Sequence, residues 1–209
     1  MIYLFDIVII ISLFFGFGII HIILASTRVK IWVTNLFDVK IAFYRIFYNI
    51  SSIILLIIVY SISPKPDLII YDLSFPFDIV IFGLQILSLS GFVWTLKFID
   101  GKEFLGTSQI KRWLNGAYDK TDLDESSEFI TDGSYKYSRH PIYFFSILFL
   151  GLRPVMDLFY LTMFCSFIIY CYVGSYFEEQ RLINKFGEQY LEYQSRVPRI
   201  FPLIFRNKK

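Results

Sequence analysis

The chain has 209 residues, of which 56% are hydrophobic and 20% are aromatic, and its formal net charge is only +2. This apolar share exceeds the roughly 45–50% of soluble domains, and the mean hydropathy is +0.56. The near-balanced charge without basic blocks excludes the electrostatic footprint of a nucleic-acid-binding protein. We therefore expect an integral membrane protein whose surroundings are the lipid bilayer, with no nucleic-acid partner.

Three long apolar runs occupy the first half of the chain, at residues 2–24, 41–62 and 77–96. Their only charged residues are Asp6, Arg45 and Asp78, one in each run. At 1.5 Å per residue, each run can cross a hydrocarbon core of roughly 30 Å as a helix. The first run is too long for a cleaved signal peptide and lacks its basic start, so we expect it to remain as a span.

Two further apolar segments lie later in the chain. The first, at 141–152, is short for a full crossing, and Gly151, Arg153 and Pro154 separate it from a longer run at 155–176. This pattern predicts a short helix, a tight turn and a long helix, that is, a helical hairpin. Beyond Glu178, apolar and aromatic residues recur near helical spacing except at Gly187, which predicts an amphipathic segment on the interface or folded back over the hairpin.

The predicted class is an all-α integral membrane protein with about five transmembrane helices. Lys and Arg concentrate in the loops after the first and third runs and in the C-terminal tail, which places the N-terminus outside and the C-terminus in the cytoplasm. A bacterial inner membrane is the expected location. One membrane domain, 1–209, would comprise three spans (1–100), a cytoplasmic loop (101–140), the hairpin (141–176) and a cytoplasmic, amphipathic C-terminal segment (177–209).

The cysteines give no sign of a metal site. Cys165 and Cys171 both lie in an apolar run and lack metal-ligand spacing. We expect two buried thiols and no bound metal.

The sequence Arg139-His140-Pro141 marks the start of the predicted short helix. Proline at the first helical position costs no hydrogen bond, so free N–H groups and the two basic side chains can bind an anion there. Tyr143 follows one turn later on roughly the same side. The alternative is an ordinary interfacial belt of Arg, His and Tyr.

Glu178 and Glu179 lie at the cytoplasmic end of the last apolar run. Carboxylates there can hold an ammonium group or accept hydrogen bonds from ribose hydroxyls. They can equally form a solvated helix end that pairs with Arg181 or Lys185.

His21, near the end of the first run, is either a proton acceptor or an interhelical hydrogen-bonding group. Asp100, Glu103 and Gln109 follow the third run. They either line a cytoplasmic cavity or cap the helix and turn there.

The order of the C-terminal motifs is more specific than any one of them. Arg-His-Pro-x-Tyr, a hairpin, Glu-Glu-x-x-Leu, Phe-Gly-x-x-Tyr-x-x-Tyr and Val-Pro-x-x-x-Pro span Gly133 to Pro202. This set resembles the isoprenylcysteine carboxyl methyltransferase superfamily of membrane enzymes, which use S-adenosylmethionine (SAM). More loosely, the segments around His21, Tyr44 and Asp100 resemble its NnrU and methanethiol S-methyltransferase branch.

The resemblance implies a SAM-dependent methyltransferase acting at the cytoplasmic face on a small or lipophilic acceptor, either a thiol such as methanethiol or a prenyl-cysteine carboxylate. A phospholipid acceptor, as in more distant members, is a further alternative. The expected cofactor-binding residues are Arg139, His140, Tyr143, Glu178, Glu179 and Tyr190. His21 is the candidate base for a thiol, and Arg199 is the group that would hold a carboxylate or close the pocket.

Three departures from the family pattern stand out. Phe145 occupies a position that is usually Gly, which is expected to alter close packing at the cofactor. Thr107-Ser108 replaces Leu-Arg, and Asp119 to Glu128 reads as an acidic, Ser-rich insertion. The last two bear on the acceptor more than on the cofactor.

Two other readings stay open. Sterol reductases share a similar Arg-His-Pro and Phe-Gly-x-x-Tyr signature and use NADPH, but they are usually much longer. A non-catalytic NnrU-like membrane protein is the second alternative.

Overall fold

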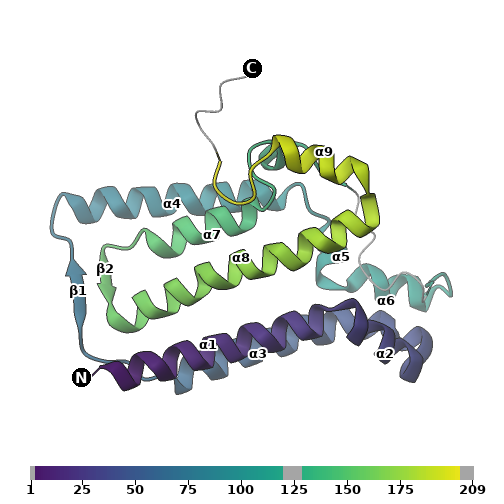
Figure 1. Ribbon diagram of the computed structural model, residues 1–209, viewed down its shortest axis with the longest axis horizontal. Coiled ribbons are helices and arrows are strands. Elements are labelled where there is room, and N and C mark those ends of the chain that lie inside the picture. Colours follow the sequence, from purple (N-terminus) through teal and green to yellow (C-terminus); the bar gives the residue numbers. More distant parts are fainter. Residues whose placement is uncertain (1–2, 120–128, 203–209) are drawn as a thin grey trace. The chain divides into compact units, whose positions relative to one another are not determined.

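The computed structural model describes residues 3–119 and 129–202. Nearly all of the insertion expected at Asp119 to Glu128 lies outside this range. The chain forms two compact units, each considered by itself (Figure 1). The N-terminal unit comprises Leu4–Pro64 and Ile99–Glu128, and the C-terminal unit comprises Lys65–Phe98 and Phe129–Lys209 together with Met1–Tyr3.

The described residues are mostly helical, and four helical stretches are long and apolar enough to cross a membrane. They are Leu4–Ala25, Thr27–Ile62, Phe77–Leu96 and Leu158–Phe186. The predicted class of helical membrane protein is therefore confirmed. The helix at Pro141–Gly151 has only 11 residues and is not one of the four, in keeping with its short apolar run.

The N-terminal unit is built around two packed apolar helices, α1 and α3. The Tyr44 hydroxyl donates to the Leu24 carbonyl at 2.7 Å and joins the two helices near one end. Ser26 caps the helix that follows α1 by accepting from the Val29 N–H. The elements of this unit are α1 (Leu4–Ala25), α2 (Thr27–Phe37), the 3₁₀ helix η1 (Asp38–Phe43), α3 (Tyr44–Ile62), α5 (Gly101–Leu105) and α6 (Thr107–Leu114).

A sharp turn after α5 is fixed against α3. Arg45 Nε and Asn49 Nδ2 donate to the Phe104 carbonyl at 2.9 and 3.0 Å. Gly106 adopts φ +93°, and a Cβ there would lie 2.9 Å from the Arg45 Cβ and 3.0 Å from the Ile46 backbone nitrogen. Only glycine fits both this backbone conformation and this close approach.

In the C-terminal unit, helices α4, α7 and α8 lie side by side (Figure 1). The loops at one end of these helices form an antiparallel strand pair, in which Ile69 faces Asp157 and Asp72 faces Val155. The sequence reading missed this pair. The elements are β1 (Ile69–Asp72), α4 (Phe77–Leu96), the 3₁₀ helix η2 (Gly133–Lys136), α7 (Pro141–Gly151), β2 (Val155–Asp157), α8 (Leu158–Phe186) and α9 (Glu188–Arg196).

Residues with known capping preferences mark both ends of helix α8. Asp157 caps its start by accepting from the Tyr160 N–H at 2.7 Å. The helix continues for nearly three turns beyond the apolar run and ends at Gly187, whose φ is +55°. The break predicted at Gly187 therefore separates α8 from α9.

Phe145 packs against a glycine. Its ring lies on Gly91 of α4, where an added Cβ would overlap the ring atoms. The missing side chain on α4 accommodates the Phe145 ring, and the expected effect of Phe145 on packing at the cofactor stays a prediction.

We predict that Gly91→Ala lowers the free energy of unfolding by about 1–3 kcal/mol, because the Phe145 ring must leave its place. Gly83→Ala, on the same helix, is the matched control, since its Cβ would meet no described atom within 4 Å. Unfolding in detergent followed by circular dichroism measures both. Equal stabilities of the two variants would contradict this packing.

Candidate active site

The start of α7 is held by the last described residues of the chain. The Arg139 N–H donates to the Pro198 carbonyl at 2.9 Å, and the His140 N–H donates to the Arg199 carbonyl at 3.0 Å. The Ser138 hydroxyl donates to the Ile200 carbonyl at 2.7 Å. The segment after α9 therefore folds back onto the residues just before α7 and takes up the backbone N–H groups of Arg139 and His140.

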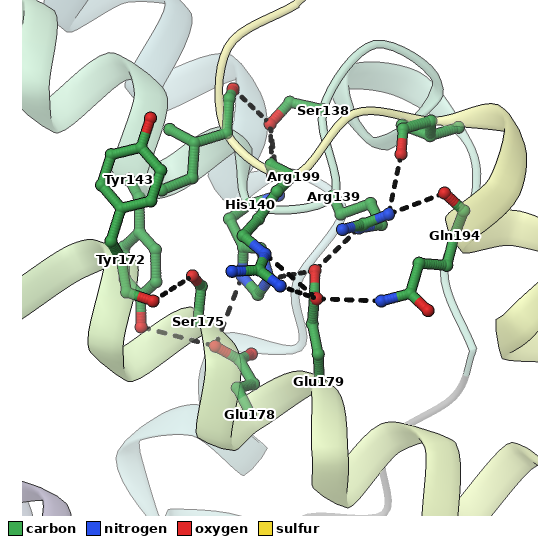
Figure 2. A network of polar contacts seen from close by, with 12 residues as sticks. Ser138, Arg139, His140, Tyr143, Tyr172, Ser175, Glu178, Glu179, Gln194 and Arg199 are labelled. Atoms are coloured by element: carbon green, nitrogen blue, oxygen red, sulfur yellow. Dashed lines mark hydrogen bonds and ion pairs between the residues drawn. The ribbon is translucent and has the colours of Figure 1, made fainter.

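The Glu179 carboxylate is the centre of the polar cluster (Figure 2). Its side chain is only 1% exposed, although it lies on α8 beyond the apolar run. Arg139 Nε lies 2.7 Å and His140 Nε2 lies 3.2 Å from its Oε1. Its Oε2 accepts from Gln194 Nε2 at 3.1 Å and from Arg199 Nε at 3.2 Å.

This arrangement stabilises a charge that would otherwise be costly to bury. An isolated carboxylate in an apolar environment is strongly unfavourable, whereas one with cationic donors on both oxygens is tolerated. Arg139 is itself fixed, because its Nη1 also donates to the carbonyls of Gln194 and Val197 at 2.7 and 3.0 Å. Glu179 thus joins α7, α8, α9 and the C-terminal segment.

Glu178 has a different environment from its neighbour. Its side chain is 40% exposed, and its Oε2 lies 3.4 Å from both His140 Nδ1 and the Tyr143 hydroxyl. The His140 and Tyr143 rings are stacked, with centroids 5.3 Å apart. Glu178 is therefore the more accessible of the two carboxylates, and it lies beside an imidazole and a phenol.

His140 bridges the two carboxylates with its two ring nitrogens. Burial acts to lower the pKa of His140, but hydrogen bonds to Glu178 and Glu179 and their negative charges outweigh burial and raise it above its ordinary value of 6.5. The doubly protonated imidazolium, which can donate from both nitrogens, is the form that this geometry favours.

Tyr190 on α9 is 2% exposed, and its hydroxyl has no hydrogen-bond partner among the described residues. Its ring packs on Phe129 and Tyr193 at centroid distances of 5.8 and 5.9 Å. Burial, followed by the charge of Glu179, raises the pKa of Tyr190, so the phenol stays neutral. A buried hydroxyl without a partner costs about 1–3 kcal/mol.

The sequence reading missed three members of this cluster. Gln194 lies one helical turn after Tyr190 and reaches Glu179 from the same helix, which is the signal that would have identified it. Ser138 fixes the C-terminal segment. Tyr135 accepts a hydrogen bond at its carbonyl from the Tyr193 hydroxyl at 2.7 Å, and burial and then the charge of Glu178 raise the pKa of its phenol to about 12.

His21 belongs to the N-terminal unit. Its Nε2 lies 2.8 Å from the Tyr48 hydroxyl, across the α1–α3 contact, and the Arg45 guanidinium lies 5.7 Å from the centre of the Tyr48 ring. The structure thus shows the interhelical hydrogen bond that the sequence offered as one alternative. A role for His21 as a base remains a proposal.

The residues after the third span make structural contacts. Asp100 caps α5 by accepting from the Lys102 and Glu103 N–H groups at 2.8 and 3.2 Å. Glu103 pairs with Arg112, and Gln109 donates to the Glu103 carbonyl at 3.0 Å. These contacts match the capping alternative rather than a cavity lining.

The two cysteines differ. Cys171 is fully buried, but Cys165 is exposed on α8, so the expectation of two buried thiols is wrong for Cys165. Within the described parts of the chain, no group of His, Cys, Asp and Glu side chains is arranged to hold a metal ion.

Comparisons with known proteins identify relatives among membrane methyltransferases. Methanethiol S-methyltransferase 1 of Bradyrhizobium diazoefficiens is 31% identical over 193 residues, which cover 89% of this chain and 63% of that protein. Methanethiol S-methyltransferase of Pseudomonas deceptionensis is 25% identical over 91% of this chain and 71% of its own length. Protein-S-isoprenylcysteine O-methyltransferase of Schizosaccharomyces pombe is 36% identical over 78 residues, 36% of this chain and 33% of that protein.

These relatives confirm the resemblance to the isoprenylcysteine carboxyl methyltransferase-like superfamily and to its methanethiol S-methyltransferase branch. The chain spans a little under two thirds of the length of the Bradyrhizobium protein. No family model matches the sequence, and no solved structure matches it.

We predict that Glu179→Gln lowers the free energy of unfolding by about 3 kcal/mol, because it leaves buried cations without their counter-charge. Glu178→Gln is the matched control on the next residue, and we expect a change below about 1 kcal/mol because its side chain is half-exposed. Chemical unfolding in detergent measures both. A larger loss for Glu178→Gln would contradict the assignment of Glu179 as the centre.

A second prediction concerns pH. A raised pKa of His140 means that its stabilising contribution is fully present below about pH 6.5 and is lost as the pH rises through the folded-state pKa. The free energy of unfolding of the natural protein should therefore fall over that window relative to His140→Asn. Parallel curves for the two proteins from pH 6 to 9 would refute a protonated His140.

Proposed function

We propose that this chain, a relative of the methanethiol S-methyltransferases within the isoprenylcysteine carboxyl methyltransferase-like superfamily, is a SAM-dependent membrane methyltransferase. The observation that carries the proposal is the contrast between the two adjacent glutamates. Glu179 holds the site together, while Glu178 keeps a half-exposed carboxylate beside His140 and Tyr143. These residues come from the ordered motifs on which the resemblance rests.

The side chains present suit SAM as a ligand. SAM carries a positive ammonium group, a positive sulfonium group and ribose hydroxyls, and Glu178 offers a carboxylate with accessible surface. Arg199, whose side chain is 35% exposed while bonded to Glu179, can face a carboxylate of the ligand or of the acceptor.

In this proposal, the main partners of Arg139 and His140 are not SAM but the Glu179 carboxylate. Arg139 is 8% exposed and His140 is 5% exposed, and both donate to Glu179. We assign Arg139 and Glu179 as positioning residues, with His140 fixing the orientation of Glu178 and stacking on Tyr143. This divides the six predicted cofactor-binding residues into those that would contact SAM (Tyr143 and Glu178) and the more deeply buried ones that would hold them (Arg139, His140, Glu179 and Tyr190).

The reaction that we propose is methyl transfer at the cytoplasmic face. SAM supplies a methyl group on a positively charged sulfur, which is already an activated leaving group. The protein mainly aligns donor and acceptor and excludes water, and alignment alone can lower the barrier by several kcal/mol. A thiol acceptor must lose its proton first, and His21 would accept it; a carboxylate acceptor needs no base and would be held by Arg199 or Arg45.

The proposed setting is a bacterial inner membrane, with the N-terminus outside and the C-terminus in the cytoplasm. The apolar α7, too short to cross alone, would act with α8 as the fourth and fifth helices of a five-helix arrangement. The acceptor is small or lipophilic: a thiol such as methanethiol, as the relatives' names suggest, or a prenyl-cysteine carboxylate.

We predict saturable SAM binding by the purified protein in detergent, measured by calorimetry. Glu178→Gln should weaken it about 10- to 100-fold, since it removes a charge-assisted contact of roughly 1.5–3 kcal/mol. Glu192→Gln is the control, because this α9 carboxylate is 70% exposed and pairs with Arg196. Folded protein without saturable SAM binding would refute the proposal.

A labelled-methyl screen against methanethiol, a prenyl-cysteine analogue and phosphatidylethanolamine then separates the acceptors. We expect transfer to at least one of the first two. Protein that binds SAM yet methylates none of them would favour the non-catalytic alternative.

A further inference from the structure

His140 lies between two carboxylates that differ in accessibility (Figure 2). Its Nε2 lies 3.2 Å from Glu179, whose side chain is 1% exposed, and its Nδ1 lies 3.4 Å from Glu178, whose side chain is 40% exposed. The two ring nitrogens therefore have different surroundings. Nε2 faces an enclosed carboxylate, whereas Nδ1 faces a carboxylate that solvent reaches.

The charges of the cluster are already balanced without a proton on both nitrogens of His140. Arg139 and Arg199 each donate to Glu179, at 2.7 and 3.2 Å. Among the described residues of the cluster, these two guanidinium groups match the two carboxylates of Glu178 and Glu179 in charge. The imidazolium form of His140 is therefore an additional positive charge.

The titratable neighbours of this cluster within the described part of the chain add no negative charge near pH 7. Arg181 on α8 adds a further positive charge beside the half-exposed glutamate. Burial raises the pKa of Tyr135 to about 12 and also raises the pKa of Tyr190. Tyr143 stacks on the His140 ring and carries a neutral phenol.

A cationic ligand at Glu178 would compete with the imidazolium for the same carboxylate. Two cations that each contact one carboxylate lie within about 6 Å of one another, where like charges repel in a partly buried site. Arginine does not lose its proton in proteins, so neither Arg139 nor Arg199 can relieve this repulsion. His140 can, because the pKa of an imidazole is close to neutral pH.

We propose that SAM binding expels the proton from Nδ1 of His140. The inference rests on the proposed function, in which Glu178 pairs with a positive group of SAM. The Nδ1–H bond breaks, the nitrogen keeps the electron pair, and the proton passes to the solvent beside Glu178. Nε2 keeps its proton and its hydrogen bond to Glu179, and a water molecule can then donate to Nδ1.

Proton release makes the affinity for SAM depend on pH. The charges of Glu178 and Glu179 raise the pKa of His140 in the free protein, and the charge of the ligand lowers it again in the complex. Binding that releases a proton becomes tighter as the pH rises. We therefore expect the dissociation constant of SAM to fall about three- to tenfold from pH 6 to 7.5, relative to His140→Asn.

The first test counts protons. Calorimetry of SAM binding to the full chain in detergent near pH 7, in buffers of different ionisation enthalpy, gives the number of protons released. We expect the natural protein to release about half a proton more than His140→Asn, which shows only the change at the SAM amino group, whose pKa is near 8. Glu192→Gln is the control and should release as many protons as the natural protein, because this 70% exposed carboxylate pairs with Arg196.

The outcomes of this test separate the two proposals. Equal proton release by the natural protein and His140→Asn would overturn the inference and leave SAM binding, and with it the proposed function, in place. Absence of SAM binding to the folded natural protein would refute the proposed function and the inference together.

The second test observes the imidazole directly and does not depend on the stability of His140→Asn. The chain has two histidines, so nitrogen NMR of the histidine-labelled protein gives two sets of ring signals, and His21→Asn assigns them. An imidazolium carries a proton on both nitrogens and a neutral ring on one, which the nitrogen shifts distinguish. We expect His140 to change from the imidazolium pattern to the neutral pattern, with the proton on Nε2, when SAM is added near pH 7. An imidazolium that persists in the SAM complex, or a ring that is already neutral without SAM, would overturn the inference.

Discussion

The C-terminal unit depends on one buried negative charge. Glu179 lies on the extension of α8 beyond its apolar part, and its carboxylate is out of contact with water. A charge in that position requires compensation, and the compensation comes from Arg139, His140 and Arg199. The partners lie 40, 39 and 20 residues away in the sequence, so satisfying one carboxylate brings three distant segments together.

The burial of Glu179 also explains why the adjacent Glu178 stays accessible. Successive residues of an α-helix point about 100° apart, so Glu178 leaves the centre of the cluster and keeps accessible surface. His140 and Tyr143 approach it without closing it off. A rigid, internally neutralised support beside an accessible carboxylate is what a site for a positively charged ligand requires. Arg139 and Arg199 support the site indirectly, because they hold Glu179 in place.

The sequence predicted the features that depend on local chemistry. The apolar runs gave the membrane-spanning helices, Pro141 gave the start of α7, and Gly187 gave the end of α8. Features that depend on distant partners could not be read from spacing. For the two glutamates the sequence left open pairing with Arg181 or Lys185 on the same helix, whereas the contacts to Glu179 come from other elements. The accommodation of Phe145 by Gly91, 54 positions earlier, likewise exists only in three dimensions, and the short β1–β2 pair lacks any periodic signal.

We propose that the start of α7, the end of α8 and the C-terminal segment form one SAM site. Hydrogen–deuterium exchange of the full chain in detergent, with and without saturating SAM, tests it most directly. We expect SAM binding to slow amide hydrogen exchange in the peptides that cover residues 138–143, 175–180 and 190–199. SAM binding that leaves these three segments unchanged and slows exchange elsewhere would contradict it.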